Sequence, residues 1–438
     1  MTCHFRSHAH ASCRLLLTLA LLTSGFLASA SSLLAAERVT NAPSQNDWPW
    51  WRGPQHTGIA TPGQKPPLEW GPNQNIAWRF AVPGRGHAQP TIVGDFIYLP
   101  TADENKEIQS VLCLQRETGK LIWKTDVHTG GLDRGGHQKT SQASATLACD
   151  GTRLIANFLH TGAVWTTALD LAGKVLWQQK ISPFVTHQGF AASPLIYGNL
   201  VIVASDNKGG GAIAALERAT GRVVWKRMRP KLPSYASPIL IKAAGKEQVV
   251  IQGCNLVTSL DPASGNLLWE TEAATTECVT TLVTDGERVF ASGGYPKNHV
   301  QAVFADGSKK VAWENKSRVY VPSMLVQGNH LYAMLDAGIA TCWDTRTGKA
   351  AWKQRIGGTF TAAPIMVNDL IYAFDEAGQA TIFRADPEKY QQVSQARIPG
   401  EQFSAPVICG SRLYLRVGQT ENGRRQEYLY AIAAPEGQ

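Results

Sequence analysis

Aromatic side chains recur along this 438-residue sequence at intervals of 45, 85, 40 and 43 residues. The five residues are Phe190, Tyr235, Tyr320, Phe360 and Phe403. Ionisable residues lie near them or at comparable positions, namely His87, His137, His187, Glu277 and Arg318. If a repeat brings these positions together, they form apolar rings with a few polar groups among them, which is the kind of surface that binds a small molecule.

A second group of candidates lies in a Gly-rich polar insert at residues 126–142, with the sequence DVHTGGLDRGGHQKTSQ. Its ionisable residues are His128, Asp133, Arg134, His137 and Lys139. Long inserts on a rigid scaffold often carry binding residues, although a solvated loop also explains this composition. The stretch GGYPKNH (293–299) is a shorter candidate of the same kind. No ligand spacing here demands a metal, so we predict no metal site.

The elements that position these residues follow from an internal repeat. Gly stands four residues before Trp in five segments, such as TGKLIW and SGNLLW, and two weaker copies also end in Trp. Each unit has a Ser/Ala-Pro start and a tight turn, such as YGNLVI (197–202), which is typical of a β-hairpin. Four short strands in each unit of about 40–45 residues indicate a propeller blade.

Eight first strands can be counted, near Thr91, Thr146, Leu195, Ile239, Leu282, Met324, Ile365 and Val407. The last unit lacks a fourth strand, whereas residues 76–80 form an isolated Trp strand at the other end of the repeat region. Pairing the two removes two exposed sheet edges. We therefore predict an all-β, eight-bladed propeller of four-stranded antiparallel blades over residues 75–438, closed by the N-terminal strand.

This ring gives the candidate residues two different roles. Residues just before each first strand line one end of the central channel, so we predict a binding site there. Its members are His87, His137, His187, Phe190, Tyr235, Glu277, Arg318, Tyr320, Phe360 and Phe403. The alternative is that the aromatic residues plug the channel or pack between blades. The repeated indoles are predicted to fill the wedges between blades, at Trp78, Trp123, Trp177, Trp225, Trp269, Trp313 and Trp352.

The repeat resembles the pyrroloquinoline quinone (PQQ) repeat, which is shared by quinoprotein alcohol dehydrogenases and BamB-type outer-membrane assembly factors. The resemblance covers about residues 75–434. The segment WPWWRGPQHTG (48–58), within an expected N-terminal extension at residues 37–74, is similar to the opening of exported PQQ-like repeat proteins of unassigned role.

The resemblance implies two opposite functions. The dehydrogenases use a catalytic Asp, a Ca²⁺ ion, a Trp stacked under the quinone and an adjacent Cys-Cys disulfide. This chain has no Cys-Cys pair, although Glu277 and Asp133 are available carboxylates. It also has no G-x-S-x-G, P-loop or H-E-x-x-H motif.

We therefore expect no catalytic residue and no cofactor. The expected function is a non-catalytic, BamB-like binding or scaffold protein, whose partner is another envelope or extracellular protein. The alternatives are a dehydrogenase that uses PQQ with Ca²⁺, and a module that binds an extracellular glycan or peptide.

The first 36 residues predict export. They carry two arginines and no acid, and an apolar run over residues 15–28 precedes Ala28-Ser29-Ala30, which is the pattern of a signal peptide. Cleavage is expected between residues 30 and 36. No Cys follows the apolar run, so the usual lipoprotein site is missing, and an uncleaved anchor is the alternative. We predict a periplasmic or secreted protein with no transmembrane segment after cleavage.

Charge and cysteines narrow the partners further. Removing residues 1–36 takes two arginines from the formal charge of +8 and leaves +6, spread without a Lys/Arg cluster, which does not indicate nucleic acid. Six of the eight cysteines lie beyond residue 36 and are widely spaced. Cys254 and Cys278 are the one pair worth testing as a disulfide, and most of the six are expected to be small buried hydrophobic residues.

Overall fold

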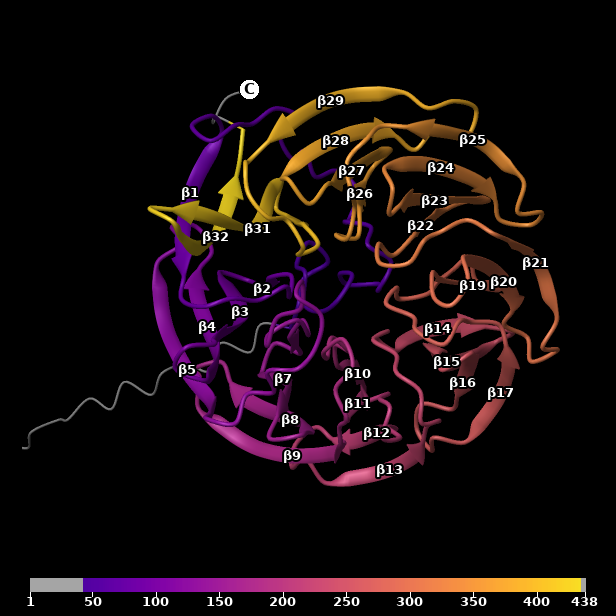
Figure 1. Ribbon diagram of the computed structural model, residues 1–438, viewed down its shortest axis with the longest axis horizontal. Helices are drawn as coiled ribbons and strands as arrows, with labels where there is room; N and C mark the ends of the chain where they lie inside the picture. The colour runs from indigo at the N-terminus through magenta and orange to yellow at the C-terminus, as the bar shows by residue number, and fades with distance from the viewer. Residues whose placement is uncertain (1–41, 435–438) are drawn as a thin grey trace, which may run out of the picture. The chain divides into compact units, whose positions relative to one another are not determined.

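The structure is a computed structural model that describes residues 42–434, so the predicted signal peptide lies outside the described residues. Residues 42–434 contain 32 β-strands and no helix. The strands form eight four-stranded antiparallel sheets arranged in a ring (Figure 1). The predicted eight-bladed all-β propeller is confirmed. None of the described residues belongs to an apolar helix of the length needed to cross a membrane.

Within each blade the strands follow one another from the centre of the ring to its rim (Figure 1). The first four blades consist of β2 (Thr91–Val93), β3 (Phe96–Asp103), β4 (Ile108–Gln115) and β5 (Leu121–Thr129); β6 (Ala148–Cys149), β7 (Arg153–His160), β8 (Ala163–Asp170) and β9 (Val175–Pro183); β10 (Leu195–Tyr197), β11 (Leu200–Ala204), β12 (Ala212–Glu217) and β13 (Val223–Met228); and β14 (Ile239–Ala243), β15 (Lys246–Gly253), β16 (Leu256–Leu260) and β17 (Leu267–Glu272).

The remaining four blades continue in the same order. They consist of β18 (Val283–Thr284), β19 (Arg288–Gly293), β20 (His299–Phe304) and β21 (Val311–Asn315); β22 (Leu325–Gln327), β23 (His330–Leu335), β24 (Ile339–Asp344) and β25 (Ala350–Arg355); β26 (Ile365–Val367), β27 (Leu370–Phe374), β28 (Gln379–Arg384) and β29 (Gln392–Arg397); and β30 (Val407–Cys409), β31 (Arg412–Glu421), β32 (Arg424–Ile432) and β1 (Ile76–Val82).

The ring closes by pairing the two ends of the repeat region. β1 is antiparallel to β32, with Arg79 opposite Tyr430 and Phe80 opposite Leu429. This pairing supplies the fourth strand that the last repeat unit lacks, so the predicted closure by the N-terminal strand is confirmed. It also covers an edge that would otherwise offer unpaired backbone groups.

Burial follows the position of a strand within its blade. Every residue of β11 (LVIVA) is buried because neighbouring blades cover both faces of the inner strands. In the outermost strand β13 (VVWKRM) only Trp225 is fully buried, and Val223, Val224 and Met228 are exposed. Seven of the eight outer strands carry one Trp, so in those blades the rim depends on this indole for its contact with the next blade.

The repeated Gly and Trp contact each other across blades rather than within one. Trp177 packs against Gly221 of the next blade, where an added Cβ would lie 2.6 Å from the indole, and its Nε1 donates to the Arg218 carbonyl at 3.0 Å. Gly221 also has φ +76°, which favours glycine. The same contact occurs in the pairs Trp78–Gly119, Trp123–Gly173, Trp225–Gly265 and Trp313–Gly348.

Two indoles depart from this arrangement where the sequence departs from the repeat. Trp269 donates to Gln248 Oε1 (2.8 Å) instead of a carbonyl of the next blade, whose turn DGSKKVAW is longer. Trp352 faces the unit that lacks the Gly-Trp motif; it donates to the Asp386 carbonyl (2.8 Å) and packs edge-on against Tyr390.

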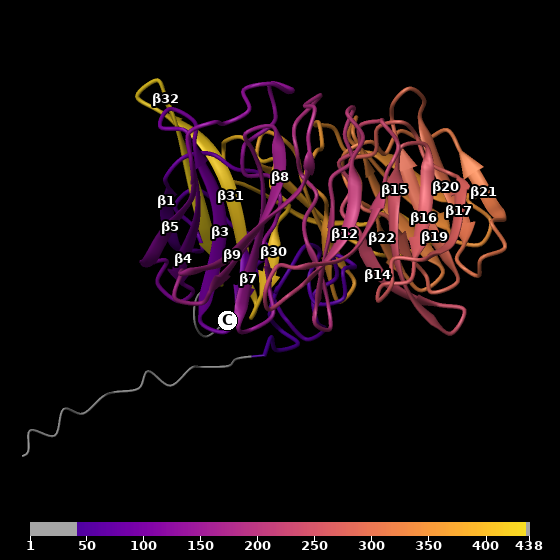
Figure 2. The same ribbon diagram turned by 90° about the horizontal axis from the view of Figure 1, so that it is seen from below.

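The two faces of the ring are built from different segments. Because strands alternate in direction, the connectors between blades all emerge on one face, which we call the connector face. Residues 42–74 cover the opposite face, where Trp48 pairs with Ile92 and Ala60 donates its backbone N–H to Met366. Figure 2 shows this segment beneath the ring.

All six cysteines between residues 42 and 434 are buried free thiols. Burial raises the pKa of the Cys278 thiol to about 11 and that of Cys113 to about 12. Cys254 and Cys278 are therefore unbonded here, and none of the six is poised as a thiolate near neutral pH.

Candidate functional site

A cavity of about 570 Å³ lies where the connectors of all eight blades meet. Each blade contributes at least one lining residue from the segment just before its first strand. The volume is within the range of small-molecule sites, about 300–1,000 Å³. The centre of the ring thus holds a concave site built from eight separate segments.

Eight of the ten residues predicted for the channel mouth line this cavity. They are His87, His137, Phe190, Tyr235, Arg318, Tyr320, Phe360 and Phe403. The other two, His187 and Glu277, are not in the lining but are hydrogen-bonded to each other close to it (2.9 Å). Whether the set binds a ligand stays a prediction.

The aromatic side chains of the lining pack against neighbouring residues of the propeller and also face the cavity. Phe360 is 2% exposed, and Phe190 packs edge-on against Phe184. Phe403 lies 4.9 Å from the His87 ring, centroid to centroid. Much of the surface of these side chains is therefore packed against other residues, as in the alternative considered above. Only part of each aromatic ring lines the cavity.

Two cations at the wall are already engaged by the protein. Lys139 Nζ lies 2.6 Å from Glu376 Oε2 and 5.9 Å from the centre of the Phe403 ring. Arg318 lies over Tyr320 at 5.0 Å and donates to the Gly294 carbonyl at 3.0 Å.

Besides Glu376, the lining contains another carboxylate, Asp336, and it is desolvated. Asp336 accepts the backbone N–H of Tyr320 at 2.8 Å. Burial raises the pKa of Asp336, and the nearby Arg318 guanidinium opposes that shift. The carboxyl group is therefore fixed in the turn between β23 and β24 as an acceptor.

Glu277 anchors one side of the cavity from behind. Its Oε1 pairs with His187 Nε2, and its Oε2 accepts the hydroxyl of Tyr320 at 3.2 Å. The Glu277 side chain is 6% exposed. Burial, reinforced by this carboxylate, raises the pKa of Tyr320, so its phenol stays protonated and keeps one orientation.

Trp51 is a cavity residue that the sequence analysis missed. It comes from the WPWWRGP motif on the opposite face, and its Nε1 donates to Thr281 Oγ1 at 2.7 Å. The rest of the motif fixes that segment: Arg52 donates to the carbonyls of Thr57 (2.6 Å) and Met324 (2.5 Å). The motif itself was a signal, but only the folded ring reveals that the segment reaches the channel.

The Gly-rich insert divides into parts with different environments. Its first residues belong to β5, where His128 is buried and stacks on His160 at 4.2 Å, so this part is not a solvated loop. Arg134 pairs with Glu107 (2.6 Å), away from the cavity lining. Only His137, Lys139 and Thr140 of the insert line the cavity.

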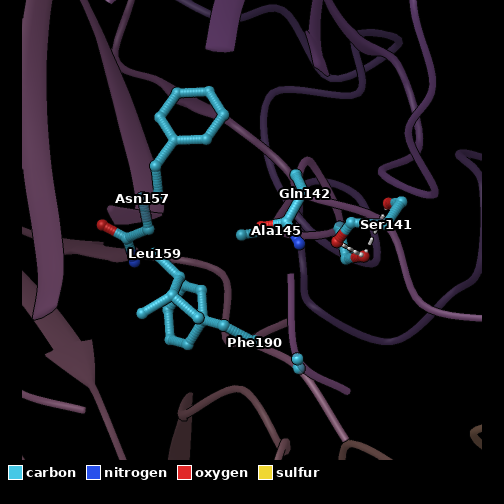
Figure 3. A pocket seen from close by; sticks show the side chains of 10 residues that line it. Ser141, Gln142, Ala145, Asn157, Leu159 and Phe190 are labelled. Carbon is cyan, nitrogen blue, oxygen red and sulfur yellow. Dashed lines mark hydrogen bonds between the residues drawn. The ribbon is translucent and has the colours of Figure 1, made fainter. Parts of the chain in front are cut away.

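A second, much smaller pocket of about 10 Å³ adjoins the cavity. Figure 3 shows Asn157, Leu159 and Phe190 on one side of it and Ser141 on the other. The hydroxyl of Ser141 is hydrogen-bonded to that of Ser144 at 2.9 Å. The volume of the pocket suits about one water molecule. Asn157 donates to the Ala192 carbonyl (3.2 Å) and accepts from Thr166 (2.8 Å), so this pocket belongs to the framework.

The donor atoms do not fit the calcium–quinone centre that the resemblance implies. Within residues 42–434, no three or more His, Cys, Asp or Glu side chains gather as a metal site would require. His187 and Glu277 come together, but Asp133 is occupied by the Thr186 hydroxyl and the Gly135 N–H.

The architecture defines a PQQ-like propeller, and the sequence places the chain in one family of that class. A family model described as outer membrane protein assembly factor BamB matches residues 72–184, 107–354 and 298–420, which is more than half of the chain. The chain belongs to this family.

A curated relative points to the other branch of the class. Polyvinylalcohol dehydrogenase from a Pseudomonas species is 25% identical over 222 residues, which cover 47% of this chain and 33% of the relative. The chain thus spans about a third of the length of that relative.

Solved structures similar to this chain likewise include both a BamB protein and a dehydrogenase. BamB from Moraxella catarrhalis matches with a TM-score of 0.59 and 14% identity, covering 83% of this chain and 99% of that chain. Quinohemoprotein alcohol dehydrogenase from Comamonas testosteroni matches with a TM-score of 0.63 and 13% identity, covering 91% and 83%. At these identities the likeness concerns the fold alone.

Proposed function

We propose that the protein is an exported, non-catalytic binding protein that holds a small ligand in the central cavity. The observation that carries this proposal is the cavity itself, about 570 Å³ in volume and lined from all eight blades. A ring whose inner strands are fully buried is a rigid support, and rigid sites lose little entropy when a ligand binds.

The wall side chains support the proposal because their positions are set before any ligand arrives. Glu277 orients Tyr320, Glu376 holds Lys139, and the Gly294 carbonyl holds Arg318. Export follows from the predicted signal peptide and is part of the proposal. The absence of a calcium donor set among residues 42–434 favours binding over quinone-dependent oxidation.

Docking of another envelope protein is the second candidate function, and the rim favours it. The outer strands of the first five blades expose apolar side chains just before the repeated Trp. These are Leu121, Ile122, Leu176, Val223, Val224, Leu267, Leu268 and Val311. Apolar residues on exposed edge strands are suited to protein contacts. A BamB-like partner would use this belt and leave the cavity free.

A fragment screen on the mature chain tests the cavity proposal. Fragments, with PQQ and Ca²⁺ included, are screened by thermal shift and by saturation-transfer NMR against the wild type and Thr359→Trp. Thr359 is an exposed lining residue, so an indole there fills the cavity without disturbing the core. Ala172→Trp, on an exposed turn outside the lining, is the matched control.

Hits that bind the wild type and Ala172→Trp but not Thr359→Trp support the proposal. Fragments that bind Thr359→Trp as well as they bind the wild type, or a screen without any binding fragment, overturn the proposal. Tight Ca²⁺-dependent binding of PQQ that Thr359→Trp removes would replace it with the dehydrogenase function.

A further inference from the structure

We infer that the ligand of the central cavity is a neutral, polyhydroxylated molecule of about the size of a disaccharide. This inference rests on the proposed function and adds the chemical class of the ligand. Three features of the lining carry it. Its charges are balanced, it has unpaired hydrogen-bond donors and acceptors, and it has aromatic side chains.

The charges of the wall are already compensated. Lys139 is paired with Glu376, and Arg318 has Asp336 nearby and Tyr320 beneath it. His87 is buried beside arginines, and burial holds its pKa well below the usual range, so it is neutral. A charged ligand would have to break an existing pair or sit without a counter-ion, and each alternative is costly in a desolvated site.

Several buried polar atoms of lining residues find no hydrogen-bond partner within residues 42–434. They include the Tyr235 hydroxyl, His87 Nε2, Glu376 Oε1 and Thr361 Oγ1. Tyr235 is 8% exposed, and its hydroxyl oxygen is buried. Leaving a buried polar group unpaired costs about 1–3 kcal/mol, which a suitable ligand would recover. The set contains two hydroxyl donors and acceptors as well, and a ligand hydroxyl can serve both.

A row of serine hydroxyls adds further donors. Ser193, Ser237 and Ser323 line the cavity, and each accepts a backbone N–H of the preceding blade at 2.9 Å. Because the oxygen is used as an acceptor, the proton of each hydroxyl is left to donate. Ser193 and Ser237 stand in the Ser-Pro starts of two neighbouring blades, and Ser323 is the serine of VPSM in a third blade, so the repeat places similar donors at equivalent positions around the cavity.

The aromatic faces complete the match. Tyr320 and Phe403 are partly exposed aromatic residues of the lining, and Phe403 lies beside His87, whose Nε2 is unpaired among residues 42–434. A sugar ring has an apolar C–H face and a rim of hydroxyls, so it can lie on an aromatic ring while its edge forms hydrogen bonds. An ordinary hydrophobic ligand would leave the buried hydroxyls unpaired, and the site would disfavour it.

Matched pairs of disaccharides test the inference by calorimetry and saturation-transfer NMR. Cellobiose is compared with cellobionate, and N,N′-diacetylchitobiose with chitobiose, so that each neutral sugar has an anionic or cationic counterpart. We expect at least one neutral sugar to bind about tenfold or more tightly than its charged counterpart. Equal or tighter binding of the charged forms overturns the inference.

Two variants locate the contact. Tyr235→Phe and Ser237→Ala each remove one hydroxyl from the lining. We expect each substitution to lower the affinity for the neutral sugar by about five- to fiftyfold. Tyr197→Phe, whose hydroxyl contacts Glu247 outside the cavity, should change nothing. Thermal denaturation shows whether each variant is folded.

The outcomes separate this inference from the proposed function. If fragments bind in a manner that Thr359→Trp blocks but no sugar binds, the ligand class is wrong and the cavity site stands. If neither binds, both fall. Sugar affinity that Tyr235→Phe and Ser237→Ala leave unchanged places the sugar elsewhere and also overturns the inference.

Discussion

The rim and the centre of this propeller use similar side chains in opposite ways. At the rim, the indole of Trp177 packs on a glycine of the next blade, and its N–H is satisfied by a backbone carbonyl. At the centre, Tyr235 is buried, yet its hydroxyl finds no partner among the described residues. At the rim the same contact recurs from blade to blade and its hydrogen bonds are made within the protein. At the centre the residues differ from blade to blade, and some of their polar atoms lack a hydrogen-bond partner among the described residues.

This difference separates residues that stabilise the propeller from residues whose unpaired polar atoms are suited to binding a ligand. A satisfied contact that recurs from blade to blade stabilises the fold, because each copy joins two neighbours. An unpaired buried group lowers stability, so a protein that carries several at one place has another use for them. The comparison predicts that rim substitutions change stability and that central substitutions change binding.

The largest expected effect is at a rim glycine. In Gly221→Ala the new Cβ would collide with the Trp177 ring at 2.6 Å, and alanine would also adopt φ +76°. We expect the free energy of unfolding to fall by about 3 kcal/mol from overpacking and backbone strain together. Urea denaturation measures this loss.

Gly198→Ala is the matched control. Gly198 has φ +54°, but nothing lies within 4 Å of the added Cβ. Only the backbone strain of about 1 kcal/mol should appear. Equal losses in the two variants would mean that the contact between indole and glycine contributes nothing to the rim.

A smaller effect is expected from pH at a buried histidine outside the cavity. Burial, with His160 alongside, lowers the pKa of His128 to about 4, against about 6.5 for an unfolded chain. The unfolded state therefore takes up a proton that the folded state refuses. This contribution to stability is complete above pH 6.5 and is lost as the pH falls towards 4, and about 2 kcal/mol of it is lost between pH 7 and pH 5.

Urea denaturation at pH 7 and pH 5, on the wild type and His128→Phe, measures this contribution. Phenylalanine keeps the packing against Phe158 and removes the titrating group, so the variant should lose less stability at the lower pH. Burial lowers the pKa of His56 to about 4 as well, so part of the decline persists in the variant. An identical decline in both proteins would contradict the assignment to His128.

The sequence was sufficient for the ring because the ring is repetitive. Gly-Trp spacing, hairpin turns and a missing fourth strand at Val407–Ile432 determined the number of blades and the partner of β1. Repetition supplies the same evidence many times, so one irregular copy, such as the turn before Trp313, did not obscure it.

The centre was only partly predictable for the opposite reason. Position before each first strand located Tyr235 and Phe360 in the lining, since every blade delivers that segment to the channel. It did not predict that Glu277 would point behind the wall or that Trp51 would arrive from the opposite face. Those placements depend on side-chain direction and on a segment outside the repeat, which a repeat pattern does not encode.

The smallest expected effect is at the apolar belt of the rim. Leu268 is 37% exposed beside the buried Trp269, so Leu268→Ser removes little packing. We expect the free energy of unfolding to change by less than about 0.5 kcal/mol and ligand binding in the cavity to stay the same. Urea denaturation and the sugar titration measure the two quantities. A larger loss of stability would mean that exposed rim residues also support the ring, whereas an unchanged fold leaves this belt available for a protein partner and places the two candidate functions on separate surfaces.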